Sequence, residues 1–130
     1  MLAYILIAVG GALGSMARYF ISGLVAAMTQ GTFPFGTLGV NITGALAIGL
    51  FAAMSSPDGR LYIAPSGRQF LMVGICGGYT TFSTFSLETL NLMRDGEWLS
   101  AVANAVFSVL LCIVGVWLGS IAGSMLNRGV

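Results

Sequence analysis

The sequence of 130 residues contains no histidine and no lysine, and only 7% of its residues are charged. Soluble domains carry roughly a quarter charged residues, so this chain has too few to cover a water-exposed surface. Its formal net charge of +1 excludes the basic patch by which proteins bind nucleic acid. An enzyme is not expected either, because there is no histidine and there are no paired carboxylates inside the apolar stretches.

The chain has two cysteines, Cys76 and Cys112, which form no CxxC pair. Both fall in apolar stretches, where a free cysteine behaves as a small buried apolar residue. We therefore expect neither a disulfide nor a metal site from them.

Apolar residues make up 57% of the chain and form stretches of about the length that a helix needs to cross a bilayer, roughly 20 residues. This pattern predicts an all-α membrane protein with a single domain over residues 1–130. The first stretch lacks a basic leading segment, so we expect a retained span and not a cleaved signal peptide. The four predicted transmembrane helices cover residues of about 2–27, 35–54, 68–93 and 99–126.

An even number of spans places both termini on one side of the membrane. That side would carry Arg60, Arg68 and Arg128, and the other side Arg18 and Arg94. Since arginine and lysine in short loops set the orientation, three against two is a weak bias. The chain is therefore expected either to insert in both orientations, which would permit an antiparallel homodimer, or to take one orientation with a poor signal.

Glycines recur at a spacing of four residues in the first and fourth spans. Small residues at this spacing let helix backbones approach closely in lipid. The spacing leaves open whether these contacts form within one subunit or between two. The glycines concerned are Gly10, Gly14, Gly115, Gly119 and Gly123.

Polar side chains inside a span are costly unless they are paired, so each is a candidate functional residue. In the second span, Thr37 and Asn41 lie one helical turn apart and share a face. Asn41 is either part of a site or only a hydrogen-bond partner for a neighbouring helix. Asn104 and Ser108 have the same spacing in the fourth span, but they lie near one end without aromatic companions, so we expect them to serve interhelical packing.

The third span contains Gly77-Gly78 followed by Thr80-Thr81 near its middle. Glycine costs about 1 kcal/mol per residue in a helix and threonine is also a weak helix former. We therefore predict a non-helical interruption at about residues 76–81. Broken helices persist inside a bilayer where they bind an ion or line a cavity, because the freed backbone groups need partners.

Beyond this break, Thr81, Thr84 and Glu88 fall at i, i+3 and i+7, which predicts one stripe of hydroxyl groups that ends in a carboxylate. Phe82 and Phe85 are three residues apart on a neighbouring face. The edge of a phenyl ring carries positive electrostatic potential. Hydroxyl groups, amide N–H groups and ring edges together would support a small anion weakly, whereas a buried arginine or lysine would hold it too tightly to conduct.

Three motifs resemble the fluoride channels of the Fluc family, also called CrcB. They are GGALGSMARY at residues 10–19, GTLGVN at 36–41 and GGYTTFSTFS at 77–86. The resemblance covers the whole chain. It implies a dual-topology homodimer of antiparallel subunits with two pores, each lined by both subunits.

The resemblance also implies roles for individual residues. Asn41 would face the pore and donate an amide N–H to fluoride, and Phe82 and Phe85 would form an aromatic box beside the ion. Backbone carbonyl groups of Gly77 and Thr80 from both subunits would hold one Na⁺ on the dimer axis. The remaining candidates for the pore are Thr37, Thr81, Ser83, Thr84 and Ser86, with Glu88 near the end of the polar track and Arg18 near an aqueous vestibule.

The expected function is passive export of fluoride through a multi-pass protein of the bacterial cytoplasmic (inner) membrane. One alternative is a small four-span proton-coupled multidrug exporter, which needs an acidic residue in its binding chamber; Glu88 is the only acid within any predicted span. The other is a non-transporting membrane scaffold. A scaffold would explain the glycines, but it would not explain the hydroxyl and phenylalanine residues around the break.

Overall fold

The computed structural model describes residues 1–56 and 62–127. Among them it contains four helical spans, each long and apolar enough to cross a membrane. The predicted all-α membrane fold is confirmed, and the helices match the predicted spans to within three residues. Arg60 and Arg128, which entered the topology argument, lie outside the described residues. The spans are α1 (Leu2–Met28), α2 (Phe35–Met54), a third made of α3 (Pro65–Arg68), the π-helical η1 (Gln69–Cys76), α4 (Gly77–Tyr79) and α5 (Phe82–Arg94), and α6 (Trp98–Asn127).

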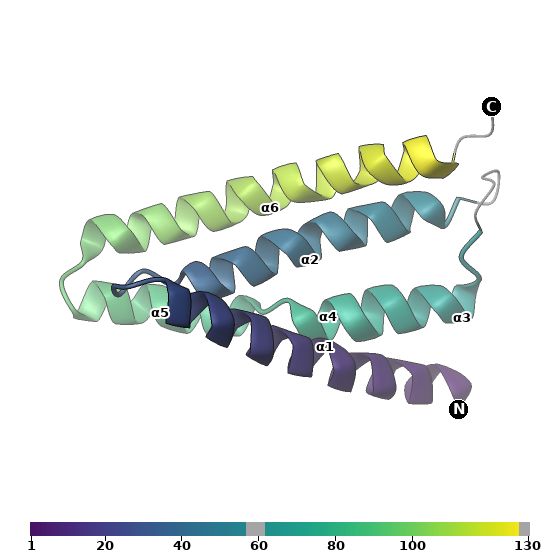
Figure 1. The fold of residues 1–130 in the computed structure, drawn as a ribbon, viewed down its shortest axis with the longest axis horizontal. Coiled ribbons are helices and arrows are strands. Elements are labelled where there is room, and N and C mark those ends of the chain that lie inside the picture. Colours follow the sequence, from purple (N-terminus) through teal and green to yellow (C-terminus); the bar gives the residue numbers. More distant parts are fainter. Residues whose placement is uncertain (57–61, 128–130) are drawn as a thin grey trace.

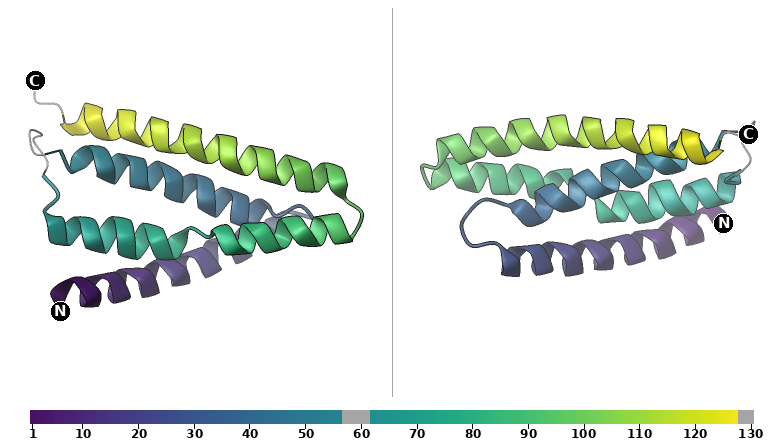
Figure 2. Two further views of the ribbon diagram at one scale, coloured as in Figure 1. Left: turned by 180° about the vertical axis from the view of Figure 1, so that it is seen from behind. Right: turned by 45° about the horizontal axis from the view of Figure 1, so that its top comes forward.

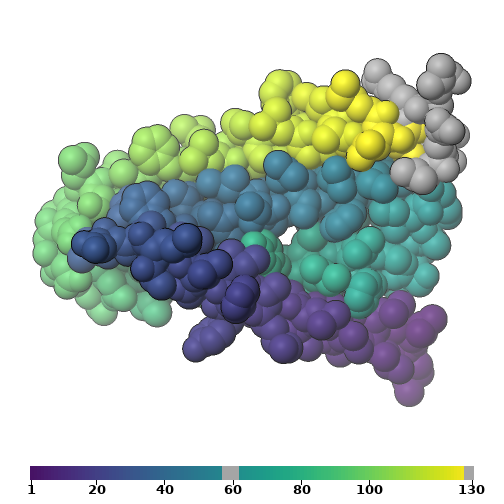
Figure 3. All heavy atoms as spheres, viewed as in Figure 1, coloured from purple at the N-terminus to yellow at the C-terminus, as the bar shows by residue number. Residues whose placement is uncertain are grey.

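The bundle places α1 against the first half of the third span and α6 against α2 (Figures 1 and 2). On the face shown in Figure 3, α2 lies between α6 and α1. The start of α1 and the end of α6 lie at the same end of the bundle (Figure 1). This is the arrangement expected for an even number of spans.

Glycine spacing brings α6 into backbone contact with α2. A Cβ atom on Gly119 would overlap the carbonyl oxygen of Leu46, and one on Gly123 would lie 2.6 Å from the carbonyl oxygen of Leu50. In the same way, a Cβ atom on Gly10 would lie 2.6 Å from the carbonyl oxygen of Phe70 in η1. These glycines therefore serve packing within one subunit. Their spacing alone had left open whether they pack within one subunit or between two.

The predicted interruption of the third span is confirmed at Thr80 and Thr81. Both residues are extended, with φ −80° and ψ 156° at Thr80 and φ −150° and ψ 115° at Thr81. The interruption is narrower than predicted, because residues 76–79 stay helical. Gly78 has another purpose: a Cβ atom there would lie 2.5 Å from the carbonyl oxygen of Gly11, so the absence of a side chain lets α1 approach.

Asn104 joins α6 to α5 in the bundle interior. It is 1% exposed, and its Nδ2 donates a hydrogen bond of 2.9 Å to Oγ1 of Thr89. Ser108 donates in turn to Oδ1 of Asn104 at 3.4 Å. The predicted interhelical packing role of Asn104 is confirmed, whereas the hydrogen bond of Ser108 stays within α6. Cys76 and Cys112 are both free thiols, and Cys76 is only 3% exposed.

Candidate functional site

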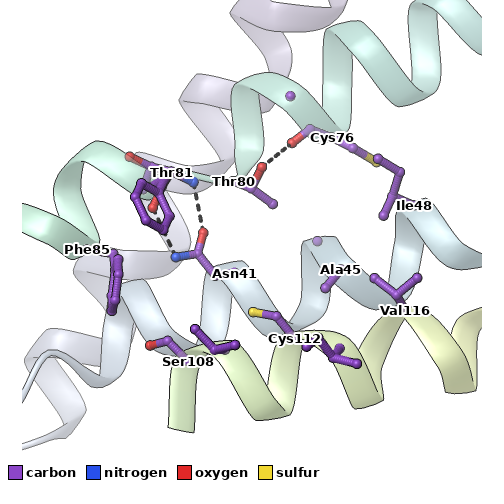
Figure 4. A pocket seen from close by; sticks show the side chains of 15 residues that line it. Asn41, Ala45, Ile48, Cys76, Thr80, Thr81, Phe85, Ser108, Cys112 and Val116 are labelled. Carbon is purple, nitrogen blue, oxygen red and sulfur yellow. Dashed lines mark hydrogen bonds between the residues drawn. The ribbon is translucent and has the colours of Figure 1, made fainter. Parts of the chain in front are cut away.

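Asn41 of α2 braces the break in the third span (Figure 4). Its Nδ2 donates to the carbonyl oxygen of Thr81 at 3.0 Å, and its Oδ1 accepts the backbone N–H of Thr81 at 2.8 Å. The amide side chain thus replaces two backbone partners that Thr81 would have in a continuous helix. Because an asparagine amide carries two N–H groups, one Nδ2–H remains beyond the bond to Thr81.

Beside this brace lies a groove of about 440 Å³ between α2, the break, α5 and α6. Asn41, Thr81 and Phe85 gather at one end of it, with Ser108 of α6 at the same end and Cys112 further along α6 (Figure 4). Every residue that lines the groove within the described chain is uncharged. The groove therefore offers amide, hydroxyl and aromatic groups without a fixed charge.

Phe82 and Phe85 lie together on this groove as a tilted pair. Their ring centroids are 5.2 Å apart and their planes meet at 50°. Phe82 is 76% exposed in the single chain, whereas Phe85 is half-buried. Both rings line the groove together with Asn41, and the edge of each ring carries positive potential.

The predicted stripe of hydroxyl groups follows one side of α5. Thr81 begins it as the N-cap: its Oγ1 accepts the N–H of Thr84 at 3.2 Å and donates to Oγ1 of Thr84 at 2.9 Å. Thr81 lines both the groove and a second cavity of about 340 Å³ between α1, α2 and α5. It therefore stands at the junction of the two spaces.

Glu88 ends the stripe next to Thr37 of α2. Oγ1 of Thr37 donates to Oε1 of Glu88 at 2.8 Å. Oε2 of Glu88 is buried and has no hydrogen-bond partner among the residues that the structure describes. Both residues line a third cavity, of about 610 Å³, which shares Thr37 and Thr84 with the second one.

Ser83 and Ser86 lie apart from that stripe. Both are exposed. Ser86 donates to the carbonyl oxygen of Phe82 at 2.8 Å, within its own helix, and Oγ of Ser83 lies 3.3 Å from Oγ1 of Thr81. The structure thus divides the predicted polar residues between the cavity side of α5, which carries Thr84 and Glu88, and an exposed side with these two serines.

Arg18 reaches the break from α1. It is half-buried, its Nε donates to the carbonyl oxygen of Gly78 at 3.2 Å, and it lines the 340 Å³ cavity. Arg18 thus lines a cavity and bonds the break, while its place near an aqueous vestibule stays a prediction.

Gly77 and Thr80 both line the groove. In a continuous α-helix the carbonyl group of Gly77 would accept the N–H of Thr81, but that N–H donates to Asn41 instead. The break therefore leaves the carbonyl group of Gly77 without the N–H partner that it would have in a continuous helix. Carbonyl oxygens are ligands that hard cations such as Na⁺ accept.

One further contact at the break escaped the sequence analysis. The hydroxyl groups of Thr43 and Tyr79 lie 2.9 Å apart, and Thr43 also donates to the carbonyl oxygen of Gly39 at 2.8 Å. The pair joins α2 to the last residue of α4. Their separation of 36 residues in the chain gives no local pattern from which the contact could be inferred.

The chain matches known proteins over nearly its whole length. The family model described as "CrcB-like protein, Camphor Resistance (CrcB)" matches residues 5–120. A relative from Rhodospirillum rubrum is 53% identical over 99% of this chain and 100% of its own, and one from Paramagnetospirillum magneticum is 52% identical over 98% and 100%. A relative from Opitutus terrae is 55% identical over 95% of this chain and 94% of its own. Each of these three relatives is named a fluoride-specific ion channel, FluC.

Proposed function

The chain belongs to the CrcB family, and we propose that it is a fluoride-specific channel through which fluoride leaves the cell passively. The family and the four apolar helices make it a multi-pass bacterial membrane protein. The observation that carries the proposal is the meeting of Asn41, Thr81 and the two phenylalanine rings at a break in a membrane span. Its relatives are channels by name, so we propose transport and not catalysis.

The groove would replace the water shell of fluoride with neutral groups. The free Nδ2–H of Asn41 and the ring edges of Phe82 and Phe85 each offer positive potential without a full charge. Because these groups bind weakly, an ion that enters is also able to leave, which conduction requires. Thr84 continues the hydroxyl groups on the cavity side of α5, and Ser83 and Ser86 add two on the exposed side.

Passive efflux fits the chemistry of the ion. HF crosses the cytoplasmic (inner) membrane uncharged, ionises in the near-neutral cytoplasm and is trapped there as fluoride. An inside-negative potential drives the anion out with about 2.3 kcal/mol per 100 mV. No step requires a protein carboxylate to exchange protons.

We further propose that two antiparallel copies form the working channel, with two pores lined by both. The support is the exposure of Phe82 and Gly77 on an open groove, since a ring that is 76% exposed leaves one side for a partner. Carbonyl groups of Gly77 and Thr80 from both copies would hold one Na⁺. That ion would supply positive charge between the two anion paths.

Neither alternative function is favoured. A proton-coupled exporter needs an acid in its binding chamber, but the described groove is lined by uncharged residues, and Glu88 lies in a different cavity. A scaffold gives no reason for a braced break, because a continuous helix would pack as well. The names of the relatives also point to conduction.

Reconstitution of the purified full chain in liposomes tests the proposal. We expect rapid fluoride efflux once the membrane potential that opposes anion loss is removed. Chloride should be retained, as in liposomes without protein. Ion-selective electrodes for both anions measure the two fluxes in the same preparation. Chloride efflux at a rate comparable to that of fluoride would contradict the selectivity, and absence of both would contradict the channel.

A further inference from the structure

The end of α4 places three carbonyl groups in different situations. In a continuous α-helix the carbonyl groups of residues 76, 77 and 78 would accept the N–H groups of residues 80, 81 and 82. Cys76 keeps its bond, at 3.0 Å from N of Thr80. The N–H that Gly77 would accept is taken by Asn41. Only the carbonyl group of Gly78 receives side-chain donors from another helix.

Those donors come from α1. Nε of Arg18 lies 3.2 Å and Oγ of Ser15 lies 3.4 Å from the carbonyl oxygen of Gly78. A basic side chain near a helix C-terminus bonds the last carbonyl groups and is attracted by the helix dipole. Arg18 therefore does for this half-helix what the next helical turn would otherwise do.

Backbone packing explains why Arg18 reaches this point. A Cβ atom on Gly14 would lie 2.8 Å from the backbone N of Tyr79, and one on Gly78 would lie 2.5 Å from the carbonyl oxygen of Gly11. α1 thus runs in direct contact with the end of α4. Arg18 follows Gly14 by four residues and so lies on the same face of α1, one turn further along.

We infer that Arg18 is a positioning residue, and that the hydrogen bond from its Nε to Gly78 fixes the end of α4 and with it the geometry of the break. The bond would act on fluoride through the position of Thr81 and of Asn41, which bonds to Thr81. The consequence for flux rests on the proposed channel function; the consequence for the break rests on the contacts alone.

Three variants separate the hydrogen bond from the charge. In Arg18→Gln, the glutamine Nε2 lies as many bonds from Cα as the arginine Nε does. An N–H group therefore remains at that place, but the charge is lost. Arg18→Lys keeps the charge but puts a methylene group at that place. Arg18→Met keeps the length and removes every donor. Each variant is compared with the wild type as the purified full chain, after size-exclusion chromatography.

Hydrogen–deuterium exchange of the peptide that covers residues 77–84 gives a measurement that does not depend on flux. Its amides include Thr80 and Thr81, whose bonds define the break. We expect Arg18→Gln to stay within about threefold of wild-type exchange, and Arg18→Lys and Arg18→Met to exchange about tenfold faster or more, as loss of one charge-assisted hydrogen bond predicts. Fluoride flux should fall in the same order.

Two results would overturn the inference. One is wild-type exchange in Arg18→Lys together with fast exchange in Arg18→Gln, which would mean that charge alone positions the break. The other is wild-type exchange in the methionine variant, or in the lysine variant if the methionine variant does not fold. If the wild type conducts no fluoride, the proposed function fails, but the exchange measurement still decides the role of Arg18.

Discussion

Asn41 has two tasks at the break, and they make different demands on its side chain. One N–H and the Oδ1 hold the backbone of Thr81, at 3.0 Å and 2.8 Å. The other N–H is the group that we propose for fluoride. An amide is able to do both, whereas a hydroxyl or a carboxylate lacks the necessary donors.

Asn41→Asp is therefore expected to stop conduction. The carboxylate still accepts from Thr81 N–H, but it faces the carbonyl oxygen of Thr81 without a proton to donate, and its charge repels an anion. Each factor of ten in rate corresponds to about 1.4 kcal/mol on the barrier, so two lost donor bonds predict a fall in fluoride flux of roughly 100-fold or more. Liposome efflux measures it.

Cys112→Ser serves as the control for Asn41→Asp, because Cys112 lines the same groove and the change is small. Its flux should stay near that of the wild type. Normal flux through Asn41→Asp would remove Asn41 from the pathway. Equal loss in both variants would indicate that the groove tolerates no change, and would leave Asn41 without a special role.

The sequence singles out the residues that line these cavities better than it predicts how they bond. Thr37 and Asn41 stand out because polar side chains are rare in a span, and Thr81, Thr84 and Glu88 because their spacing fits one helix face. The two bonds between Asn41 and Thr81 depend on the angle of a bend, and the bond from Arg18 to Gly78 depends on how closely α1 approaches. No local sequence pattern predicts the angle of the bend or the approach of α1.

Among the helices described, α2 and α6 contact each other most extensively, and glycine permits this contact. Gly119 lies against the backbone of Leu46 and Leu50, with a Cβ position 3.0 Å from N of Leu50. Without this approach, α6 would move away from α2, and the wall of the groove that carries Ser108 and Cys112 would move with it.

Gly119→Ala should therefore destabilise the protein. An added methyl group in a tightly packed interface costs about 1–3 kcal/mol, which we expect to appear as a lower melting temperature of the purified protein. Gly23→Ala is the matched control, since a Cβ atom at Gly23 meets nothing within 4 Å and alanine favours the helix. A melting temperature of Gly119→Ala equal to that of Gly23→Ala would contradict the glycine contact.

In the third span, helix propensity predicts that a break exists but not where it begins. Weak helix formers at residues 77–81 correctly predict a break, because no strong preference opposes it. They do not say where the break begins: Gly77 and Gly78 remain helical, since α1 packs against Gly78 and leaves no room for a side chain. The two threonines are extended instead, and Thr81 caps the helix that follows. Tertiary contacts place the break, and composition only permits it.

For the whole molecule, the four spans follow from apolar length alone, but the assembly does not. The single chain has large apolar side chains exposed along its helices, as a lipid-facing surface requires, and the same composition would cover an interface between two copies. Length and hydropathy do not distinguish the two. The exposed Phe82 and Gly77 on the groove are the features that favour a partner there.

Sodium offers a test of that assembly. If carbonyl groups of Gly77 and Thr80 from two copies hold one Na⁺, the ion binds only the folded dimer, and it stabilises that state by about 2.7 kcal/mol at 100 times its dissociation constant. Replacing Na⁺ with choline, which is too large for such a site, should lower both the melting temperature of the dimer and its fluoride flux. The melting temperature is measured at fixed protein concentration and ionic strength, so that dissociation and screening do not change with the cation. An identical melting temperature in Na⁺ and in choline would exclude a sodium ion from the interface, and the two copies would then need another reason to meet at the break.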